Sequence, residues 1–177
     1  ISDSAVRMRA LIDDLLTYSQ AGSEPASQQI VDLNVVLSWA LENLRESIER
    51  SGAVITSCTL PSVAGDEPQL GQVFQNLIGN AIKYSRPGVQ PVIEITASQK
   101  ADECVIAIRD NGLGIDNEYF HQIFAPFKRL HGRDIPGTGI GLAMCRRIIE
   151  AHGGRIWVES VAGQGSTFSF SFPALIC

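Results

Sequence analysis

The chain has 177 residues, of which 45% are hydrophobic and 19% charged, the balance of an ordinary globular domain with a buried core. Its formal net charge of −5 and the lack of a basic run argue against a nucleic-acid partner. No uninterrupted apolar stretch reaches about 18 residues, and no signal-peptide layout begins the sequence. We therefore expect no direct membrane contact and a cytoplasmic location.

The cysteines and the first residues of the chain support the same setting. Four widely separated cysteines form neither a C-x-x-C pair nor a zinc-site spacing, which predicts reduced, mostly buried thiols. The chain begins at Ile1 with no methionine before Met8, so it is expected to be a fragment of a longer protein, whose missing part could carry a membrane anchor.

The first residues predict a helix and a linker ahead of one globular domain. Apolar residues recur at helical spacing through the first 20 residues, and the next stretch, with Gly, Pro and Ser, has the composition of a linker. We expect an amphipathic helix within 1–21, a linker over 22–29 and the globular domain over 30–177.

The first half of this domain is expected to alternate short strands with amphipathic helices. After an extended piece near 29–31, helical spacing of apolar residues predicts one long helix from Asp32 or Asn34 to about residue 50. A strand is expected over 53–59. The Asp-Glu-Pro sequence at 66–68 is a typical helix start and predicts a helix to about residue 85.

The second half contains four segments with strand periodicity. The stretches "VIEITAS" (92–98) and "CVIAIRD" (104–110) predict neighbouring antiparallel strands. Residues 139–152 have helical periodicity, and two further strands are expected at 155–161 and 166–172. Strands that pair in runs while the helices gather together indicate an α+β fold, in which a mixed sheet is covered by helices on one face.

A polar stripe runs along the helix predicted after residue 66. Gln72, Asn76, Asn80 and Lys83 follow one another at steps of four, four and three, so they share one helix face. Beside a polyphosphate, a neutral Asn oxygen can join the shell of Mg²⁺ without adding charge repulsion, and Lys83 can neutralise phosphate charge. The alternative from the helix alone is an ordinary solvated face.

Two glycine-containing stretches are candidate ligand sites. In "RDNGLGI" (109–115), Asp110 ends a strand and glycines follow, so its carboxylate could accept hydrogen bonds from an adenine amine. In "PGTGIGLAM" (136–144), glycines lead into a helix, where bare N–H groups can bind an anion. Its spacing fits neither the dinucleotide fingerprint nor the P-loop. An Asn-Gly turn and a flexible loop remain the respective alternatives.

The order and spacing of these stretches resemble the catalytic ATP-binding domain of sensor histidine kinases, within the family shared with type II topoisomerases, Hsp90 and MutL. "QVFQNLIGNAIKYS" looks like the N box of that family, "RDNGLGI" its G1 box, "FAPFKRL" its F box and "PGTGIGLAM" its G2 box. The resemblance covers about 30–173. It implies a two-layer α/β sandwich, the Bergerat ATP-binding fold, preceded by one helix.

The resemblance also implies roles for individual residues, with ATP and Mg²⁺ as cofactors. Asn80 would bind Mg²⁺, Asp110 would hold the adenine amine, and Asn80, Lys83 and Arg129 would be the catalytic residues. The ATP-binding residues that it implies are Asn76, Asn80, Lys83, Tyr84, Asp110, Gly112, Gly114, Ile115, Lys128, Arg129, Gly137, Thr138, Gly139, Gly141, Leu142 and Thr167.

The implied partners are those of a two-component kinase. The first 20 residues resemble the end of the second helix of a dimerisation and phosphoacceptor hairpin, yet none of the three histidines has the phosphoacceptor context. The acceptor histidine is therefore expected on a helix absent from this fragment, in its own chain or in a dimer partner. A response regulator receiver domain and a homodimeric parent protein are also implied.

Two other functions remain as alternatives. An ATPase of the topoisomerase, chaperone or mismatch-repair type uses a glutamate on the N-box helix to activate water, and here the helix has no Glu after Glu67. A non-catalytic nucleotide-binding adaptor would need no intact site, whereas Asn80, Asp110 and the glycines are all present.

Overall fold

The computed structural model describes residues 12, 15, 16, 18, 19, 29–100, 102–128 and 137–174. The five described residues before Gln29 are helical, as predicted for this segment. The remainder of the predicted N-terminal helix, and the linker up to residue 28, lie outside the described residues. None of the described helices is both long and apolar enough to cross a membrane.

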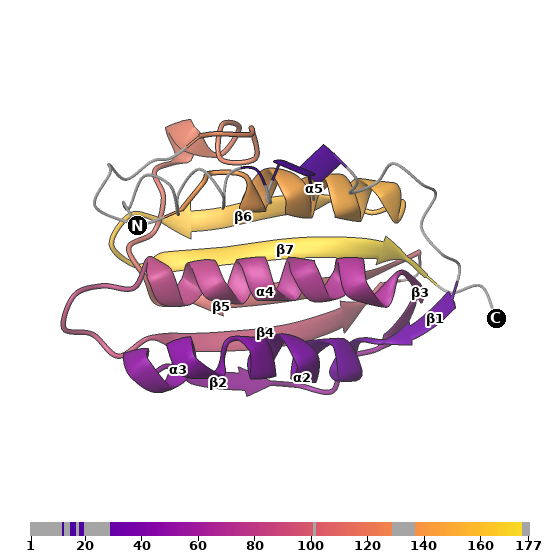
Figure 1. The fold of residues 1–177 in the computed structure, drawn as a ribbon, viewed down its shortest axis with the longest axis horizontal. Helices are drawn as coiled ribbons and strands as arrows, with labels where there is room; N and C mark the ends of the chain where they lie inside the picture. The colour runs from indigo at the N-terminus through magenta and orange to yellow at the C-terminus, as the bar shows by residue number, and fades with distance from the viewer. Residues whose placement is uncertain are drawn as a thin grey trace.

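A five-stranded sheet forms one layer of the domain (Figure 1). Its strand order is β2-β4-β5-β7-β6. The strands are β2 (Val54–Ser57), β4 (Val92–Gln99), β5 (Glu103–Asp110), β6 (Ile156–Val161) and β7 (Gly165–Pro173). Strand β2 pairs with β4 in parallel and the other neighbours are antiparallel, which confirms the predicted mixed sheet.

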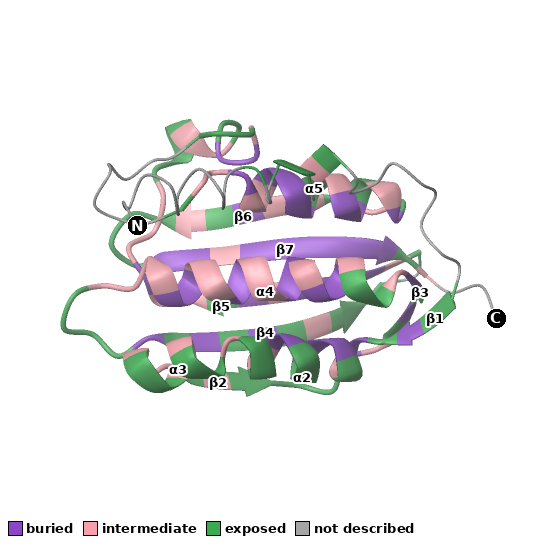
Figure 2. Cartoon of the chain, viewed as in Figure 1, coloured by how far each residue is buried: buried purple, intermediate pink, exposed green. Residues whose placement is uncertain are grey.

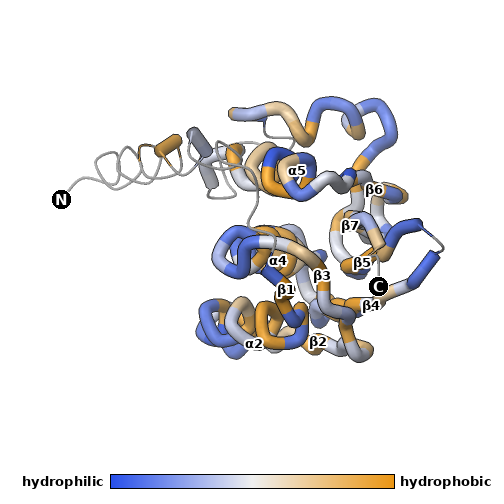
Figure 3. The backbone as a smooth tube through the Cα atoms, turned by 90° about the vertical axis from the view of Figure 1, so that its right-hand side faces the viewer, coloured by the Kyte–Doolittle hydropathy of each residue, from blue (hydrophilic) through white to orange (hydrophobic). Residues whose placement is uncertain are grey.

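Helices form the second layer, on one face of this sheet. They are α2 (Leu33–Asn43), α4 (Glu67–Lys83) and α5 (Gly141–Ala151), with a one-turn 3₁₀ helix, η1 (Asn117–Tyr119), before α5. The view along the layers in Figure 3 places the helices on one side of the sheet, with no described helix on the other. The predicted two-layer α/β sandwich is therefore confirmed.

Two features of the first half differ from expectation. Strand β3 (Ser62–Gly65) pairs antiparallel with β1 (Gln29–Asp32) in a separate two-stranded sheet that the sequence pattern did not indicate. The single helix predicted to residue 50 is divided at Leu44 into α2 and α3 (Arg45–Ser51). Asp32 is the N-cap of α2, because its side chain accepts a hydrogen bond from the Asn34 amide.

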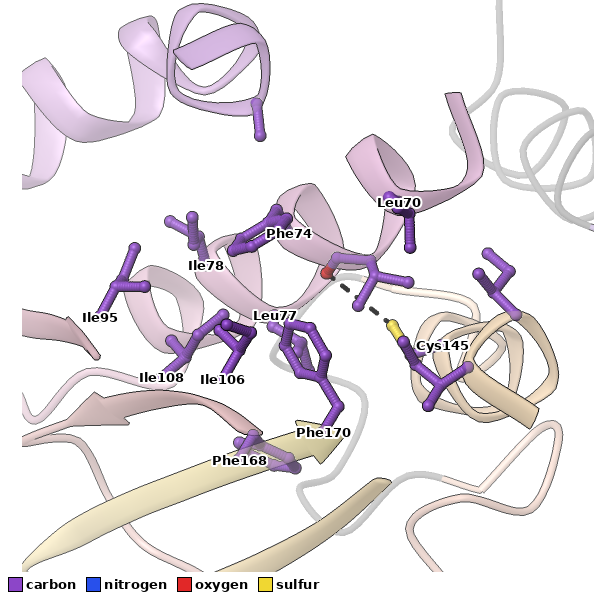
Figure 4. Close-up of a cluster of buried hydrophobic side chains, with 14 of the residues drawn as sticks. Leu70, Phe74, Leu77, Ile78, Ile95, Ile106, Ile108, Cys145, Phe168 and Phe170 are labelled. Atoms are coloured by element: carbon purple, nitrogen blue, oxygen red, sulfur yellow. Dashed lines mark hydrogen bonds between the residues drawn. The ribbon is translucent and has the colours of Figure 1, made fainter. Parts of the chain in front are cut away.

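The core lies between α4 and the sheet (Figure 2). One face of α4 is buried along its length, and Phe168, Phe170 and Phe172 of β7 are buried against the helices, as their alternation predicted. Phe74 of α4 meets Phe170 edge to face, with ring centroids 5.6 Å apart. Figure 4 shows this contact, and beside it the thiol of Cys145, which points from α5 toward α4. Helix α4 is thereby fixed against the sheet and against α5.

His152, the C-cap of α5, connects the C-terminal end of α5 to the N-terminal end of α4. Its Nε2 accepts a hydrogen bond from the Asp66 amide at 3.0 Å, so this nitrogen carries no proton. The proton therefore lies on Nδ1, which donates to the Ile148 carbonyl at 2.8 Å. Asp66 is the N-cap of α4, and the histidine consequently fixes where both helices stand relative to each other.

Candidate active site

A cleft with two compartments lies between α4, the start of α5 and the ends of β5 and β7. The compartments have cavity volumes of about 80 and 180 Å³. They adjoin each other, because both are lined by Asn80, Tyr84, Ile123, Lys128 and Leu142. The polar stripe of α4 and the acidic end of β5, which are 30 residues apart in sequence, therefore face one shared space.

The smaller compartment is apolar around a single carboxylate. Asp110 ends β5, and its Oδ1 accepts hydrogen bonds from the amides of Gly112 at 2.8 Å and Ser166 at 3.2 Å. Its Oδ2 receives no hydrogen bond from any residue that the structure describes. Burial raises the pKa of Asp110 and the two amides act in the opposite direction. The other lining residues confined to this compartment are Ala81, Leu113, Gly114, Ile115, Ser166 and Phe168.

The glycines after Asp110 are required by neighbouring backbone. A Cβ at Gly112 would lie 2.6 Å from the Tyr84 carbonyl oxygen, and Gly114 has φ +69° with the Val161 carbonyl where its Cβ would be. No other residue type could bring the loop so close to α4 and to the end of β6. Gly112 is not among the residues that line the cleft, whereas Gly114 and Ile115 are.

We expect Gly114→Ala to destabilise the domain by about 3 kcal/mol, since it combines left-handed strain with a backbone collision. Gly52→Ala is the matched control, because Gly52 has φ +65° but nothing within 4 Å of its Cβ position. That change should cost only about 1–2 kcal/mol. Urea denaturation of both variants measures the difference, and equal losses would show that the Val161 collision is relieved by small movements.

The larger compartment is lined by the polar stripe. Gln72, Asn76, Asn80 and Lys83 of α4 all face it, opposite the start of α5. The buried Nδ2 of Asn76 has no hydrogen-bond partner among the described residues. Its Oδ1 would lie 3.0 Å from a Cβ at Gly141, so the glycine that begins α5 leaves space for this amide. The two helices thus approach closely at the polar end of the cleft.

The ammonium group of Lys83 lies at the edge of this compartment. Its Nζ is 4.6 Å from the centre of the Tyr84 ring, a cation–π contact. A Cβ at Gly137 would be 2.5 Å from the same atom. The lysine therefore presents its charge beside the glycine-rich turn, where Thr138 and Gly139 also line the compartment.

The start of α5 offers backbone donors to the same space. Its N-cap is Ile140, whose side chain makes no capping hydrogen bond. Gly139 has φ +79°, and its carbonyl accepts a hydrogen bond from the Phe127 amide at 2.9 Å. The helix dipole and the backbone N–H groups of this first turn make this end of the cleft suited to an anion.

Two of the predicted site residues, Gly112 and Thr167, line neither compartment, and a third lies outside the described residues. Thr167 faces the open side of the sheet with Arg109 and Glu159, because successive side chains of β7 alternate between its two faces. Its neighbour Ser166, on the same face as Phe168, lines the cleft instead. Arg129 is not among the residues that the structure describes.

Part of the apolar lining had no role assigned from the sequence. Leu113 lies inside the stretch "RDNGLGI", and Ile123 directly precedes the stretch "FAPFKRL". Only the fold shows that both side chains line the compartment beside α4. Asp110 is the single carboxylate among the described residues that line either compartment. No group of three or more His, Cys, Asp or Glu side chains within the described ranges could hold a metal ion alone.

Comparison with known proteins identifies the family. Residues 65–176 match the family described as "Histidine kinase-, DNA gyrase B-, and HSP90-like ATPase". The chain is 48% identical over 167 residues to the phytochrome-like protein Cph1 of Synechocystis sp., a match that covers 94% of this chain and 22% of the relative. The chain thus spans about a fifth of the length of Cph1 and of two similar cyanobacterial phytochromes of Nostoc sp..

Solved structures agree with this match. Full-length ShkA in complex with AMPPNP has a TM-score of 0.78 at 27% identity, over 97% of this chain and 36% of that one. The histidine kinase ThkA in complex with the response regulator TrrA has a TM-score of 0.74 at 26% identity, over 97% of this chain and 48% of that one. The chain belongs to the family of histidine kinase-, DNA gyrase B- and HSP90-like ATPases and, within it, to the catalytic ATP-binding domains of sensor histidine kinases.

Proposed function

We propose that the chain binds ATP with Mg²⁺ in this cleft and transfers the γ-phosphoryl group to a histidine on a phosphoacceptor helix outside residues 1–177. The observation that carries the proposal is the single cleft between Asn80 and Asp110. A small apolar compartment with one carboxylate adjoins a larger polar compartment lined by amides, an ammonium group and a helix N-terminus. ATP is divided in the same way, because a flat purine at one end is joined to a charged triphosphate at the other.

The purine would enter the small compartment. The available Oδ2 of Asp110 would accept a hydrogen bond from the exocyclic amine, while Oδ1 stays engaged by the Gly112 and Ser166 amides. The apolar side chains of Ile115 and Phe168 would cover the ring. Adenine carries an amine at the position where guanine carries a carbonyl, so a carboxylate acceptor favours ATP over GTP.

The triphosphate would enter the large compartment. Lys83, Lys128 and the first turn of α5 would balance its charge, with Arg129 as a further candidate. The described residues contain no carboxylate cluster that could hold a metal ion, which fits a Mg²⁺ ion that takes most of its ligands from phosphate and water. Asn80 would provide the protein ligand, with Asn76 beside it near the phosphates. Bound there, the ion would neutralise charge that develops between the β- and γ-phosphates.

The reaction would be an in-line transfer to an imidazole nitrogen. A P–N bond forms to the histidine, the bond between the γ-phosphorus and the bridging oxygen breaks, and ADP leaves with that electron pair. The proton on the attacking nitrogen passes to a base near the acceptor. The residues of this chain would contribute positioning and charge neutralisation, and the Phe127 hydrogen bond to Gly139 would hold Phe127 beside the phosphate-facing turn.

The partners follow from this reaction. The acceptor hairpin would belong to the same chain or to its partner in a homodimeric parent, and the phosphoryl group would then pass to a response regulator receiver domain. The similarity of this chain to ThkA, which was solved in complex with a response regulator, supports the last step. An ATP-dependent signalling reaction also implies a cytoplasmic location. An ATPase that uses a glutamate as base gains no support, because Asp110 is the only carboxylate on the described cleft lining.

We expect radiolabelled γ-phosphate to appear on a separately produced phosphoacceptor hairpin of the parent protein when it is mixed with this chain, Mg²⁺ and ATP. Acid-labile label on the hairpin, absent when its acceptor histidine is replaced by alanine, is the predicted result. Release of inorganic phosphate without hairpin labelling would favour the ATPase alternative. Nucleotide binding with neither reaction would favour the adaptor alternative.

A further inference from the structure

The purine end of the cleft is walled by three backbone segments that meet at Leu113. The Leu113 amide donates to the Tyr84 carbonyl at 2.9 Å, and the Leu113 carbonyl accepts from the Gly163 amide at 2.6 Å. The last turn of α4, the loop after β5 and the turn between β6 and β7 are thereby joined at one residue. Because Leu113 and Tyr84 both line the apolar compartment, the shape of this compartment depends on how the three segments are held.

Arg86 bridges the same three segments through its side chain. It follows Tyr84 by two residues, its Nε donates to the Asn111 carbonyl at 2.8 Å, and its Nη1 donates to the Gly163 carbonyl at 3.2 Å. A planar guanidinium holds two acceptors at a fixed separation, which an ammonium group cannot do. The side chain is half-buried, and it has no ion pair with the residues that the structure describes. Its described partners are therefore backbone carbonyls on the two sides of Leu113.

One of these acceptors is itself held in place. The Asn111 side chain accepts from the Val92 amide at 2.9 Å and donates to the Gln90 carbonyl at 3.0 Å. Arg86 thus connects the β6–β7 turn to a residue that is fixed against the start of β4. Arg86 is not among the residues that line the cleft, so any effect on a ligand must pass through Leu113 and Gly114.

We propose that Arg86 is a positioning residue for purine recognition, which holds the loop at 111–114 and the turn at Gly163 at the separation that lets Asp110 distinguish adenine from guanine. The inference rests on the proposed binding of ATP in this cleft. Loss of the guanidinium bridge loosens the wall beside Leu113 and leaves Asn80, Lys83 and the start of α5 untouched. Loss of the bridge therefore weakens binding of the purine base and leaves binding of the phosphates unchanged.

The test is calorimetric titration of the complete chain, with Mg²⁺, against ATP, GTP and inorganic tripolyphosphate. Arg86→Lys keeps the charge but loses the planar guanidinium that donates to both carbonyls. We expect it to raise the Kd for ATP about tenfold. Tripolyphosphate binding should stay unchanged and the preference for ATP over GTP should fall. Arg86→Gln, which removes the charge and cannot reach both carbonyls, should give a loss of the same kind.

Arg155→Lys is the matched control. Its guanidinium also bridges two groups, Glu103 and the Trp157 ring, but it lies away from the cleft and should leave all three affinities unchanged. Unchanged ATP affinity in Arg86→Lys, or an equal loss for ATP and tripolyphosphate, would overturn the inference. Wild-type protein that binds no ATP would instead overturn the proposed function, so the two failures are distinguishable.

Discussion

Asp110→Asn is expected to weaken ATP binding roughly 10- to 100-fold while leaving the unliganded domain at least as stable as the wild type. The carboxylate accepts hydrogen bonds only, so it suits an exocyclic amine, whereas an amide in its place can present its own NH₂ group to that amine. Burial raises the pKa of Asp110, which means that the charged form is disfavoured in the folded protein. Isothermal titration calorimetry and urea denaturation measure the two effects.

The raised pKa gives this prediction a pH signature. A carboxyl whose pKa is higher in the folded state contributes stability at low pH, and this contribution is lost as the pH rises through the folded pKa. Asparagine does not titrate, so the variant does not lose this part of the free energy of unfolding at neutral pH. ATP binding requires the charged form, so wild-type affinity should fall on acidification, starting at a higher pH than for an exposed carboxyl, and the variant should lack this component. If Asp110→Asn binds ATP as tightly as the wild type, Asp110 does not bind the purine.

Asn80→Ala is expected to abolish the dependence of ATP affinity on Mg²⁺. Asn80 lines both compartments, so its amide oxygen can reach the junction of base and phosphates. Affinity measured with EDTA should hardly change, whereas affinity with Mg²⁺ should fall by at least about tenfold, toward the metal-free value. Paired titrations with and without the ion measure this difference directly.

Gln75→Ala is the control for the same helix. Gln75 lies on α4 but does not line the cleft, so its loss should leave both titrations unchanged. If Asn80→Ala binds Mg²⁺–ATP as tightly as the wild type, Asn80 is not a metal ligand. If it weakens binding equally in EDTA, its role is to contact the nucleotide without the ion.

Regular elements of this fold were predictable because burial repeats along them. Helix α4 was predicted from its cap and its apolar face, and the antiparallel pair β4–β5 from period-2 alternation. Strand β3 was missed because four residues contain too little periodicity, and the strand that it pairs with, β1, lies about 30 residues earlier. The division at Leu44 has no Gly or Pro to mark it, so the long apolar pattern concealed it.

Site residues were predictable where they belong to a sequence motif. They were not predictable where only the folding of distant segments brings them to the cleft. Asn80 and Asp110 belong to recognisable stretches, and the fold brings both to one cleft. Thr167 stays a predicted site residue, but it lies on the opposite face of β7 from Phe168, and the alternation along the strand would have indicated Ser166 for the cleft lining. Arg86 had no signal in the sequence, because its carbonyl partners lie 25 and 77 residues away along the chain.

The most direct test of the shared cleft is a crystal structure of the chain with AMPPNP and Mn²⁺, with anomalous scattering used to find the metal. We expect the purine amine beside Oδ2 of Asp110 and the anomalous peak beside the side-chain oxygen of Asn80, with both belonging to one bound Mn²⁺–AMPPNP. A nucleotide with its base in the polar compartment would contradict it. So would a metal or nucleotide bound elsewhere, such as the hollow beside Trp39.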